Sequence, residues 1–305
     1  MLDFGSNSTR MSVTEVASDG SFKEVKRAKE MTRLAEGMGQ GEETKYLKKP
    51  AIARTLAALE EFKKLYADLP NLSVRGIATA AVREAENKDE FLRLVKNVTG
   101  ADVEILSGSS EAYYDYLAVI NTLTIKDCVI CDMGGGSFEL VLVKNRKAVN
   151  YISIPYGAVS LTEKFKASDK ISANDYFNFY RFINYKFHQL PWLIEGQKLP
   201  LVLLGGANRT VARKELIRLG KKDLDHIHGL RMSSYLFLDT YTDMLKKDQV
   251  QRKMILGPEA ARADIIIGGL TPIAFLLEYL QAPGVIFSES GVREGVLYSL
   301  LKKNN

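Results

Sequence analysis

Apolar residues recur with the period of a helix in the first third of the chain. Their spacings of three and four place one apolar stripe along a helix, formed by Ile52, Leu56, Leu59, Phe62, Tyr66 and Leu69. Further along, Asn87 and Glu90 resemble a capping box at the start of a second helix. The next expected elements are a strand at 74–78, helix 87–98, a strand at 103–106 and helix 111–120. Strands that alternate with helices favour an α/β fold.

The second half of the chain continues this alternation. The expected elements, in order, are strands at 129–132 and 140–143, an aromatic-rich helix at 173–192, a strand at 201–204, a helix at 260–280, a strand at 285–288 and a last helix ending at Leu301. Neither a low-complexity segment nor a short tandem repeat interrupts the pattern. With 305 residues, the chain is longer than one core usually organises, so two domains are expected.

Two distant segments repeat one another. Both segments have the pattern apolar-Asp-x-Gly-small-small-Ser, and a strand-like run follows each. They are LDFGSNS at residues 2–8 and CDMGGGS at residues 131–137. Each segment is therefore predicted to be a strand, a tight polar turn and a returning strand. The repeat indicates two related domains, 1–125 and 126–305, and we expect the last helix to pack back on the first domain.

Composition adds few constraints. Lys and Arg number 42 against 37 Asp and Glu, and this net charge of +5 suits a polyanionic substrate as well as a nucleic acid. No run approaches the ~18 apolar residues of a membrane span. The first residues lack the basic and apolar regions of a signal peptide, so a cytoplasmic location is expected.

The two cysteines, Cys128 and Cys131, form a C-x-x-C sequence inside an apolar strand-like run. Side chains three apart on a strand point to opposite faces. A structural zinc site would also need further ligands, and the sequence contains no second pair. We therefore expect neither a redox nor a zinc role.

Three glycine-containing turns follow predicted strands. They contain Gly5-Ser6-Asn7-Ser8, Gly134-Gly135-Gly136-Ser137 and Gly205-Gly206. Glycines let backbone N–H groups converge on an anion, and serine hydroxyls add donors, so these turns are candidate phosphate sites. The chain lacks a P-loop sequence, and it has no well-placed dinucleotide-binding glycine motif.

Several charged residues suit phosphoryl chemistry. Asp3 and Asp132 end strands beside two of the turns, and Glu139 follows on a returning strand; such carboxylates can hold Mg²⁺ or cap turns. Glu111 begins a helix, where it can orient water or interact with the helix dipole. Arg83 can grip a phosphate or lie on the surface.

The motifs together resemble the exopolyphosphatase/guanosine pentaphosphate phosphatase family of the actin–sugar kinase–Hsp70 superfamily. The resemblance runs through LDFGSNS (2–8), ATAAVREA (78–85), ILSGSSEA (105–112), DMGGGSFEL (132–140), RADII (262–266) and GVREG (291–295). It implies an α/β fold of two actin-like (ribonuclease H-like) domains with a cleft between them.

The resemblance also implies the chemistry. It favours Glu111 as general base, with Asp132 and Glu139 catalytic and, with Asp3, ligands of Mg²⁺. The implied phosphate ligands are Ser6, Asn7, Ser8, Arg10, Thr79, Arg83, Gly134, Gly135, Gly136, Ser137, Gly205 and Gly206. The expected reaction is release of terminal orthophosphate from inorganic polyphosphate.

Other functions remain open at this stage. One alternative removes the 5′ terminal phosphate of guanosine pentaphosphate, and another binds polyphosphate or a nucleotide without turnover. A kinase or ATPase of the same superfamily would share the turns. Neither a nucleic acid nor a membrane is expected as a partner, and a homodimer is plausible in such a family.

Three features depart from the family pattern. Ser109 and Ser110 stand where the family often has another acid, which would weaken the positioning of metal or water. Only two residues precede Asp3, whereas the first strand of the family would begin several residues earlier. Loss of that strand would expose an edge of the sheet. The chain also stops near the end of the two-domain core, which disfavours a strong grip on very long polyphosphate.

Overall fold

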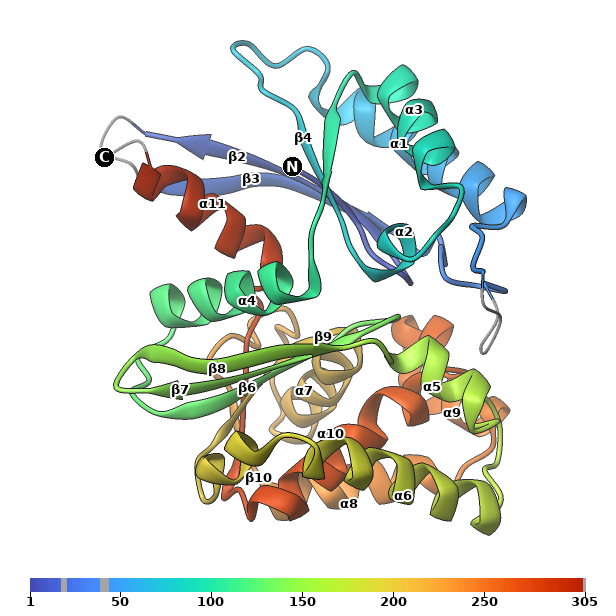
Figure 1. The fold of residues 1–305 in the computed structure, drawn as a ribbon, viewed down its shortest axis with the longest axis vertical. Helices are drawn as coiled ribbons and strands as arrows, with labels where there is room; N and C mark the ends of the chain where they lie inside the picture. Colours follow the sequence, from blue (N-terminus) through green and yellow to red (C-terminus); the bar gives the residue numbers. More distant parts are fainter. Residues whose placement is uncertain (18–20, 39–43, 304–305) are drawn as a thin grey trace. The chain divides into compact units, whose positions relative to one another are not determined.

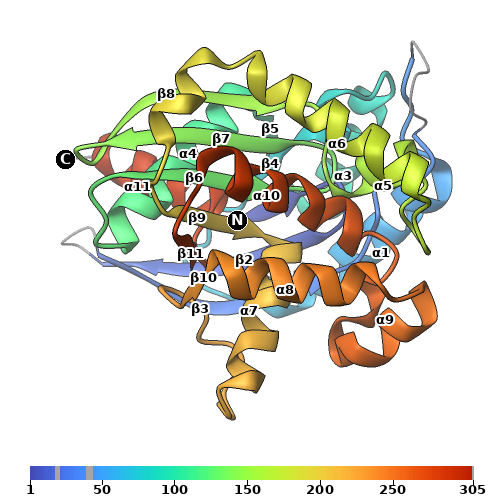
Figure 2. The ribbon, with the colours of Figure 1, turned by 90° about the horizontal axis from the view of Figure 1, so that it is seen from below.

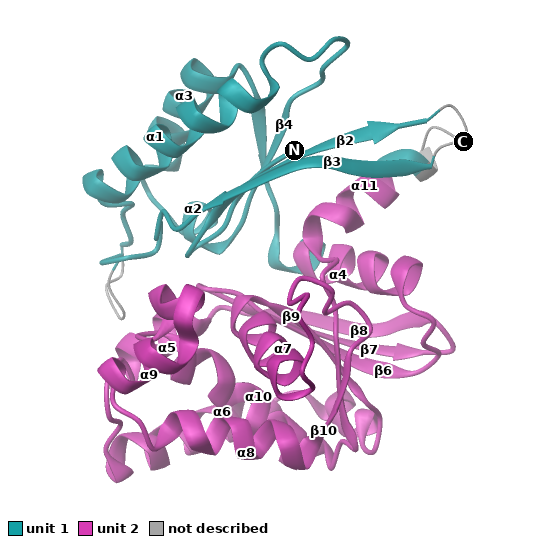
Figure 3. Cartoon of the chain, turned by 180° about the vertical axis from the view of Figure 1, so that it is seen from behind, with its two compact units in different colours: residues 1–110, 300–305 teal, residues 111–299 magenta. Residues whose placement is uncertain are grey.

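The computed structural model describes residues 1–17, 21–38 and 44–303, which belong to two compact units (Figure 1). Unit 1 comprises residues 1–110 and 300–305, and unit 2 comprises residues 111–299 (Figure 3). The first boundary lies one helix before the domain boundary expected near residue 125. That boundary, and the packing expected for the last helix, stay predictions.

The sheet of unit 1 has five strands in the order β3-β2-β1-β4-β5. Its strands are β1 Leu2–Phe4, β2 Thr9–Val16, β3 Phe22–Glu30, β4 Arg75–Ala78 and β5 Asp102–Ile105. Although β1 has three residues, it is central, since it pairs antiparallel with β2 and parallel with β4. The helices are α1 Lys49–Tyr66, α2 Ala80–Arg83 and α3 Lys88–Thr99. Phe4 packs edge-to-face on Phe91 of α3, with ring centroids 5.7 Å apart.

The sheet of unit 2 has six strands in the order β10-β11-β9-β6-β7-β8. Its strands are β6 Cys128–Met133, β7 Phe138–Lys144, β8 Lys147–Ile154, β9 Leu201–Gly205, β10 Arg231–Ser233 and β11 Gly284–Phe287. Without β10, the order and the strand directions are those of unit 1. The repeat seen in the sequence is therefore a repeat of structure, and the fold is the expected actin-like α/β fold of two domains.

Helices pack on both faces of the second sheet (Figure 2). The remaining helices of the chain are α4 Gly108–Thr122, α5 Ala158–Lys164, α6 Ala173–His188, α7 Gly206–Arg218, α8 Ser234–Leu245, α9 Gln249–Leu256, α10 Ile266–Leu280 and α11 Val292–Lys303, with 3₁₀ helices η1 Pro191–Gly196 and η2 Gly257–Arg262. Buried residues of α4 share one apolar cluster with one face of the sheet. A larger cluster joins the other face to α5, α6, α7, α8 and α10.

The cysteines lie on opposite faces of β6, as the strand period predicts. Cys128 belongs to the cluster under α4, whereas Cys131 belongs to the larger cluster. Burial raises the pKa of the Cys128 thiol to about 12 and that of Cys131 well above its ordinary value. Both side chains therefore behave as small apolar groups.

Three local predictions differ from the structure. The helix expected over 260–280 is interrupted, because η2 ends at Arg262 and α10 begins at Ile266. The helix expected over 173–192 ends at His188, and Pro191 starts a separate 3₁₀ turn. Asn87 does not cap α3 through its side chain; that side chain instead bonds the backbone N–H and C=O of Leu47 at 2.9 and 3.0 Å.

Among the described residues, no single helix has the length and apolar composition to cross a membrane. The segments 249–262 and 266–280 meet those criteria together, but a bend of 95° separates them.

Candidate active site

The second repeated hairpin brings two predicted carboxylates together. Asp132 near the end of β6 pairs in register with Glu139 on the antiparallel strand β7. Residues directly opposite on paired strands carry neighbouring side chains on the same face. The turn between them is closed by Gly134, whose N–H donates to the Ser137 carbonyl at 3.0 Å. The hairpin itself therefore creates a two-carboxylate site.

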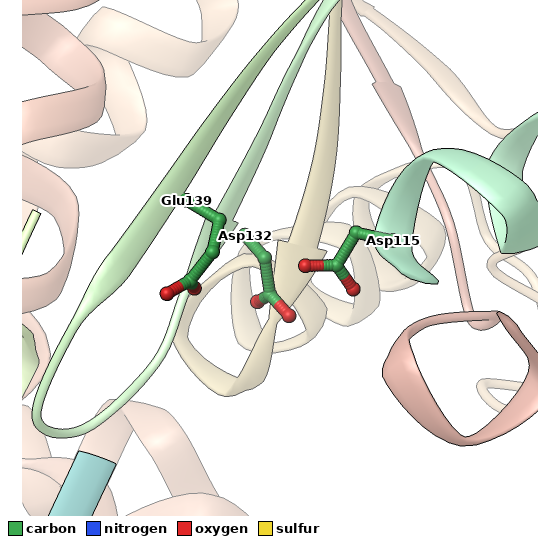
Figure 4. A group of neighbouring side chains, drawn as sticks. All are labelled: Asp115, Asp132 and Glu139. Carbon is green, nitrogen blue, oxygen red and sulfur yellow. The ribbon is translucent and has the colours of Figure 1, made fainter. Parts of the chain in front are cut away.

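A third carboxylate, that of Asp115 on α4, completes the cluster. One oxygen from each of Asp115, Asp132 and Glu139 lies within 4.8 Å of the others. The Asp115 carboxylate points toward Asp132 (Figure 4). Asp115 is 0% exposed, and neither of its carboxylate oxygens has a hydrogen-bond partner within the described part of the chain. A cluster of this kind is able to hold a metal ion.

Burial and mutual repulsion both disfavour negative charge in this cluster. Burial raises the pKa of Asp115 well above its ordinary value, and the charges of Asp132, Glu139, Glu111 and Glu294 raise it further. Burial, Glu111 and Asp132 likewise raise the pKa of Glu139. The Ser153 hydroxyl donates to Glu139 at 2.7 Å, which partly opposes that shift. A bound cation or shared protons would relieve the repulsion.

Glu111 lies beside this cluster. It is in the first turn of α4, is 3% exposed, and stands one helical turn before Asp115. Residues four apart on a helix share a face. The structure thus directs the predicted base and Asp115 to the same face of α4, and the charge of Glu111 acts on both Asp115 and Glu139.

The serines that depart from the family pattern organise the start of α4. The Ser107 hydroxyl lies 2.9 Å from that of Ser109 and 2.8 Å from that of Ser110. It also accepts the backbone N–H of Ser110 at 3.1 Å, which is the geometry of a helix N-cap. These hydroxyls therefore stabilise the first turn of the helix that carries Glu111.

The first repeated hairpin, in unit 1, has the same turn with different side chains. Gly5 donates to the Ser8 carbonyl at 3.2 Å, as Gly134 does to Ser137. Ser6 and Ser8 are buried. Asn7 Nδ2 and Arg10 Nε are buried donors with no hydrogen-bond partner among the residues that the structure describes. This turn is therefore rich in donors, as an anion site requires.

The other predicted residues of unit 1 surround the ends of its central strands. Asp3 on β1 is opposite Arg10 on β2. Thr79 follows β4, and its N–H donates to the Phe4 carbonyl at 3.3 Å. Arg83 ends α2 and donates to the Leu106 carbonyl at 2.8 Å. The metal role of Asp3 and the phosphate roles of Thr79 and Arg83 stay predictions.

The third glycine turn lies next to Asp132. Gly205 has φ +96°, and a Cβ built there would lie 2.3 Å from the Met133 carbonyl oxygen and 2.8 Å from Asp132 Oδ1. A Cβ on Gly206 would lie 2.2 Å from a guanidinium nitrogen of Arg262. Only glycine lets the backbone approach these groups so closely.

Comparison with known proteins agrees with the fold. The model of the Ppx/GppA phosphatase family matches residues 12–304. The chain belongs to this family. A crystal structure of the Aquifex aeolicus family member is 30% identical, covers 100% of this chain and 97% of its own, and superposes with a TM-score of 0.80. An exopolyphosphatase from Cytophaga hutchinsonii, 22% identical over 99% of this chain and 97% of its own, shares the fold with a TM-score of 0.91.

Curated relatives carry different names. A bifunctional 3-dehydroquinate synthase/phosphatase of Fusobacterium nucleatum is 29% identical over 95% of this chain, which spans 44% of that protein. A putative exopolyphosphatase of Haemophilus influenzae is 28% identical over 99% of this chain and 90% of its own. A guanosine-5′-triphosphate,3′-diphosphate pyrophosphatase of Vibrio vulnificus is 28% identical over 99% of this chain, which spans 59% of that protein.

Sequence reasoning about this Ppx/GppA phosphatase missed two features of the site. Asp115 was not a candidate, although its spacing of four from Glu111 on a predicted helix was visible in the sequence. Glu259 was also missed: it accepts hydrogen bonds from Thr210 and Arg213 and lies 3.7 Å from Arg262 Nε. No sequence spacing reveals that network, since its members come from α7 and η2.

Proposed function

We propose that this Ppx/GppA phosphatase releases terminal orthophosphate from inorganic polyphosphate with the help of Mg²⁺. The observation that carries the proposal is the cluster of the buried Asp115 and Glu139 with the half-buried Asp132, beside Glu111. Such a concentration of buried carboxylates is stable when a cation neutralises it. Mg²⁺ binds carboxylate oxygens and phosphate oxygens together, so this donor set suits it.

The chain's own residues have distinct roles in the proposed reaction. Glu111 accepts a proton from water, whose oxygen attacks the terminal phosphorus. The P–O bond to the rest of the polymer breaks, and the shortened chain leaves as a phosphate anion. Asp132 and Glu139 would hold Mg²⁺, which when bound neutralises charge on the phosphoryl oxygens.

The glycine turns and the donor-rich hairpin support the binding of phosphate. Asn7 Nδ2 and Arg10 Nε have buried N–H groups that the described protein does not satisfy, and phosphate oxygens are suitable acceptors. We assign the remaining phosphate contacts to Thr79 and Arg83 and to the turns at 134–137 and 205–206. Positioning and charge neutralisation would then supply most of the catalysis.

A second substrate is favoured by one comparison. The Vibrio vulnificus relative is named for a guanosine substrate, and its identity of 28% equals that of the putative exopolyphosphatase from Haemophilus influenzae. Hydrolysis of the terminal 5′ phosphate of guanosine pentaphosphate would use the same carboxylates. The two substrates therefore belong in one experiment.

The test is phosphate release with Mg²⁺ from short polyphosphate, long polyphosphate and guanosine pentaphosphate. We expect Glu111→Gln to lower turnover by ~10² or more, as for loss of a positioned base. Glu60→Gln on the exposed side of α1 is the control and should retain full turnover. Full turnover of Glu111→Gln would remove Glu111 from the mechanism. Tight binding of all three compounds without release would replace the hydrolase with a polyphosphate-binding protein.

A further inference from the structure

Asp115 occupies an unusual place for a carboxylate. It lies on the side of α4 that packs against the sheet. The other buried residues of α4 in this packing include Ala112, Val119 and Ile120. Both of its oxygens are buried without a hydrogen-bond partner in the described chain. A buried carboxylate without a partner strongly destabilises a fold unless a cation or a proton neutralises it. The surroundings of Asp115 must therefore supply a positive species.

The charged neighbours of Asp115 supply no positive charge. The groups whose charges act on it are Asp132, Glu139, Glu111 and Glu294, and all of them are acidic. No described Lys, Arg or His forms an ion pair with it. Shared protons would neutralise these carboxylates one at a time, whereas a single divalent cation can bind several of them at once.

A glycine, Gly291, faces Asp115 from the segment before α11. A Cβ built on Gly291 would lie 3.5 Å from Asp115 Oδ1, so a larger side chain there would fill the space next to this oxygen. The Gly291 N–H donates to Glu294 Oε2 at 2.8 Å, which fixes the start of α11. Gly295 then packs on the Tyr114 carbonyl so closely that a Cβ would overlap it. The segment 291–295 thus packs against α4, and at position 291 it places backbone rather than a side chain next to Asp115.

We propose that Asp115 is a direct ligand of the divalent cation held by Asp132 and Glu139, and that this ligation ties the helix of Glu111 to the sheet. The proposal rests on the cation of the proposed function and adds a third ligand from a third element. The ligands would then come from β6, β7 and α4. Binding of the cation would position Glu111, because Glu111 stands one turn before Asp115 on the same helix.

The first experiment measures Mn²⁺ binding by calorimetry, without any substrate. We expect Asp115→Asn to weaken Mn²⁺ binding at least ~10-fold, since even partners that only orient a ligand are worth that much. Asn keeps the shape of the side chain, but it removes the charge and replaces one acceptor oxygen by a donor NH₂ group. Asp239→Asn, the same change at an exposed position of α8, should bind Mn²⁺ as the wild type does.

The second measurement is thermal unfolding in EDTA and in saturating Mn²⁺. In EDTA, Asp115→Asn should unfold at a higher temperature than the wild type, because one buried charge is gone. The rise in Tm on adding Mn²⁺ should be smaller in the variant. A purely structural role would instead change Tm equally in both conditions.

A third variant changes the chemistry of the ligand. Asp115→Cys offers a soft thiolate, so its affinity for Cd²⁺ relative to Mn²⁺ should rise at least ~10-fold over that of the wild type. Asp239→Cys should show no such rise. This gain does not depend on how stable Asp115→Asn is.

The outcomes separate the two proposals. Equal Mn²⁺ affinity in the wild type and Asp115→Asn, with no gain of Cd²⁺ affinity in Asp115→Cys, would overturn the role of Asp115 and leave the cation at Asp132 and Glu139. Absence of Mn²⁺ binding in the wild type would overturn the cation of the proposed function as well.

Discussion

Gly205 offers a sharp test of the packing around the site, because its substitution by alanine combines strain with collision. Its backbone has φ 96° and ψ 171°, a region that residues with a Cβ scarcely populate. The new methyl would lie 2.3 Å from the Met133 carbonyl oxygen and 2.8 Å from Asp132 Oδ1. Neither neighbour can move freely, since Met133 lies in β6 and pairs with Gly205 itself.

The magnitude follows from two contributions. Backbone strain in this region costs of order 1–3 kcal/mol. Overpacking by one methyl against a rigid neighbour adds about 1–3 kcal/mol. Gly205→Ala should therefore lower the free energy of unfolding of unit 2 by about 2–6 kcal/mol, a large part of the stability of a typical domain.

Gly220→Ala separates the two contributions. Gly220 has φ +70°, but a Cβ there would meet nothing within 4 Å. Gly220→Ala should lower the free energy of unfolding only by the strain of a left-handed residue, about 1–2 kcal/mol. The assay is urea unfolding followed by the fluorescence of Trp192, the single tryptophan of the chain, which lies in unit 2.

Mn²⁺ binding gives a second measurement on the Gly205→Ala variant, through Asp132. Because the methyl of Gly205→Ala would push against Asp132, the variant should also bind Mn²⁺ more weakly, whereas Gly220→Ala should not. Equal urea midpoints for the two variants would refute the argument that the turn at Gly205 is packed against β6. Unchanged Mn²⁺ affinity in Gly205→Ala would separate this turn from the carboxylate cluster.

Two further predictions concern titration and reactivity. The raised pKa values of Asp115 and Glu139 mean that the folded state holds their protons more tightly than the unfolded state does. In EDTA, stability should therefore be greatest below the ordinary pKa values of these groups, 3.8 and 4.5, and be lost as the pH rises through the higher folded pKa values. Urea midpoints should fall as the pH is raised above the ordinary values, and they should change less with Mg²⁺ present. Cys128 and Cys131 should react with a thiol reagent at least ~10²-fold more slowly in the native protein than in urea, because both are buried thiols; fast native labelling would contradict their packing.

The structural repeat was predictable because it follows from short sequence motifs. Both hairpins consist of an apolar strand, an Asp, a glycine turn with Ser and a returning strand, and the turns close with the same hydrogen bond, from Gly5 to Ser8 and from Gly134 to Ser137. The pairing of Asp132 with Glu139 then follows from the length of the hairpin. Short-range geometry of this kind can be read from a sequence.

Other elements depend on partners that the sequence does not reveal. The strand β3 Phe22–Glu30 is almost entirely exposed and lacks an apolar alternation, so its strand character comes from its pairing with β2. Asp115 is similar: helix periodicity places it with Glu111, but only packing of α4 on the sheet shows that this face is buried. A carboxylate on a buried face is an exception to the usual pattern, and such exceptions concentrate where function requires them.

The two hairpins share a backbone but differ in what they leave unsatisfied. In unit 1 the turn contains buried donors without partners, at Asn7 Nδ2 and Arg10 Nε. In unit 2 the corresponding hairpin contributes acceptors, and Asp115 adds two more that are unpaired. Unsatisfied donors attract an anion, and unsatisfied carboxylate oxygens attract a cation. Two copies of one backbone motif therefore differ in the charge that each would bind, an anion in unit 1 and a cation in unit 2.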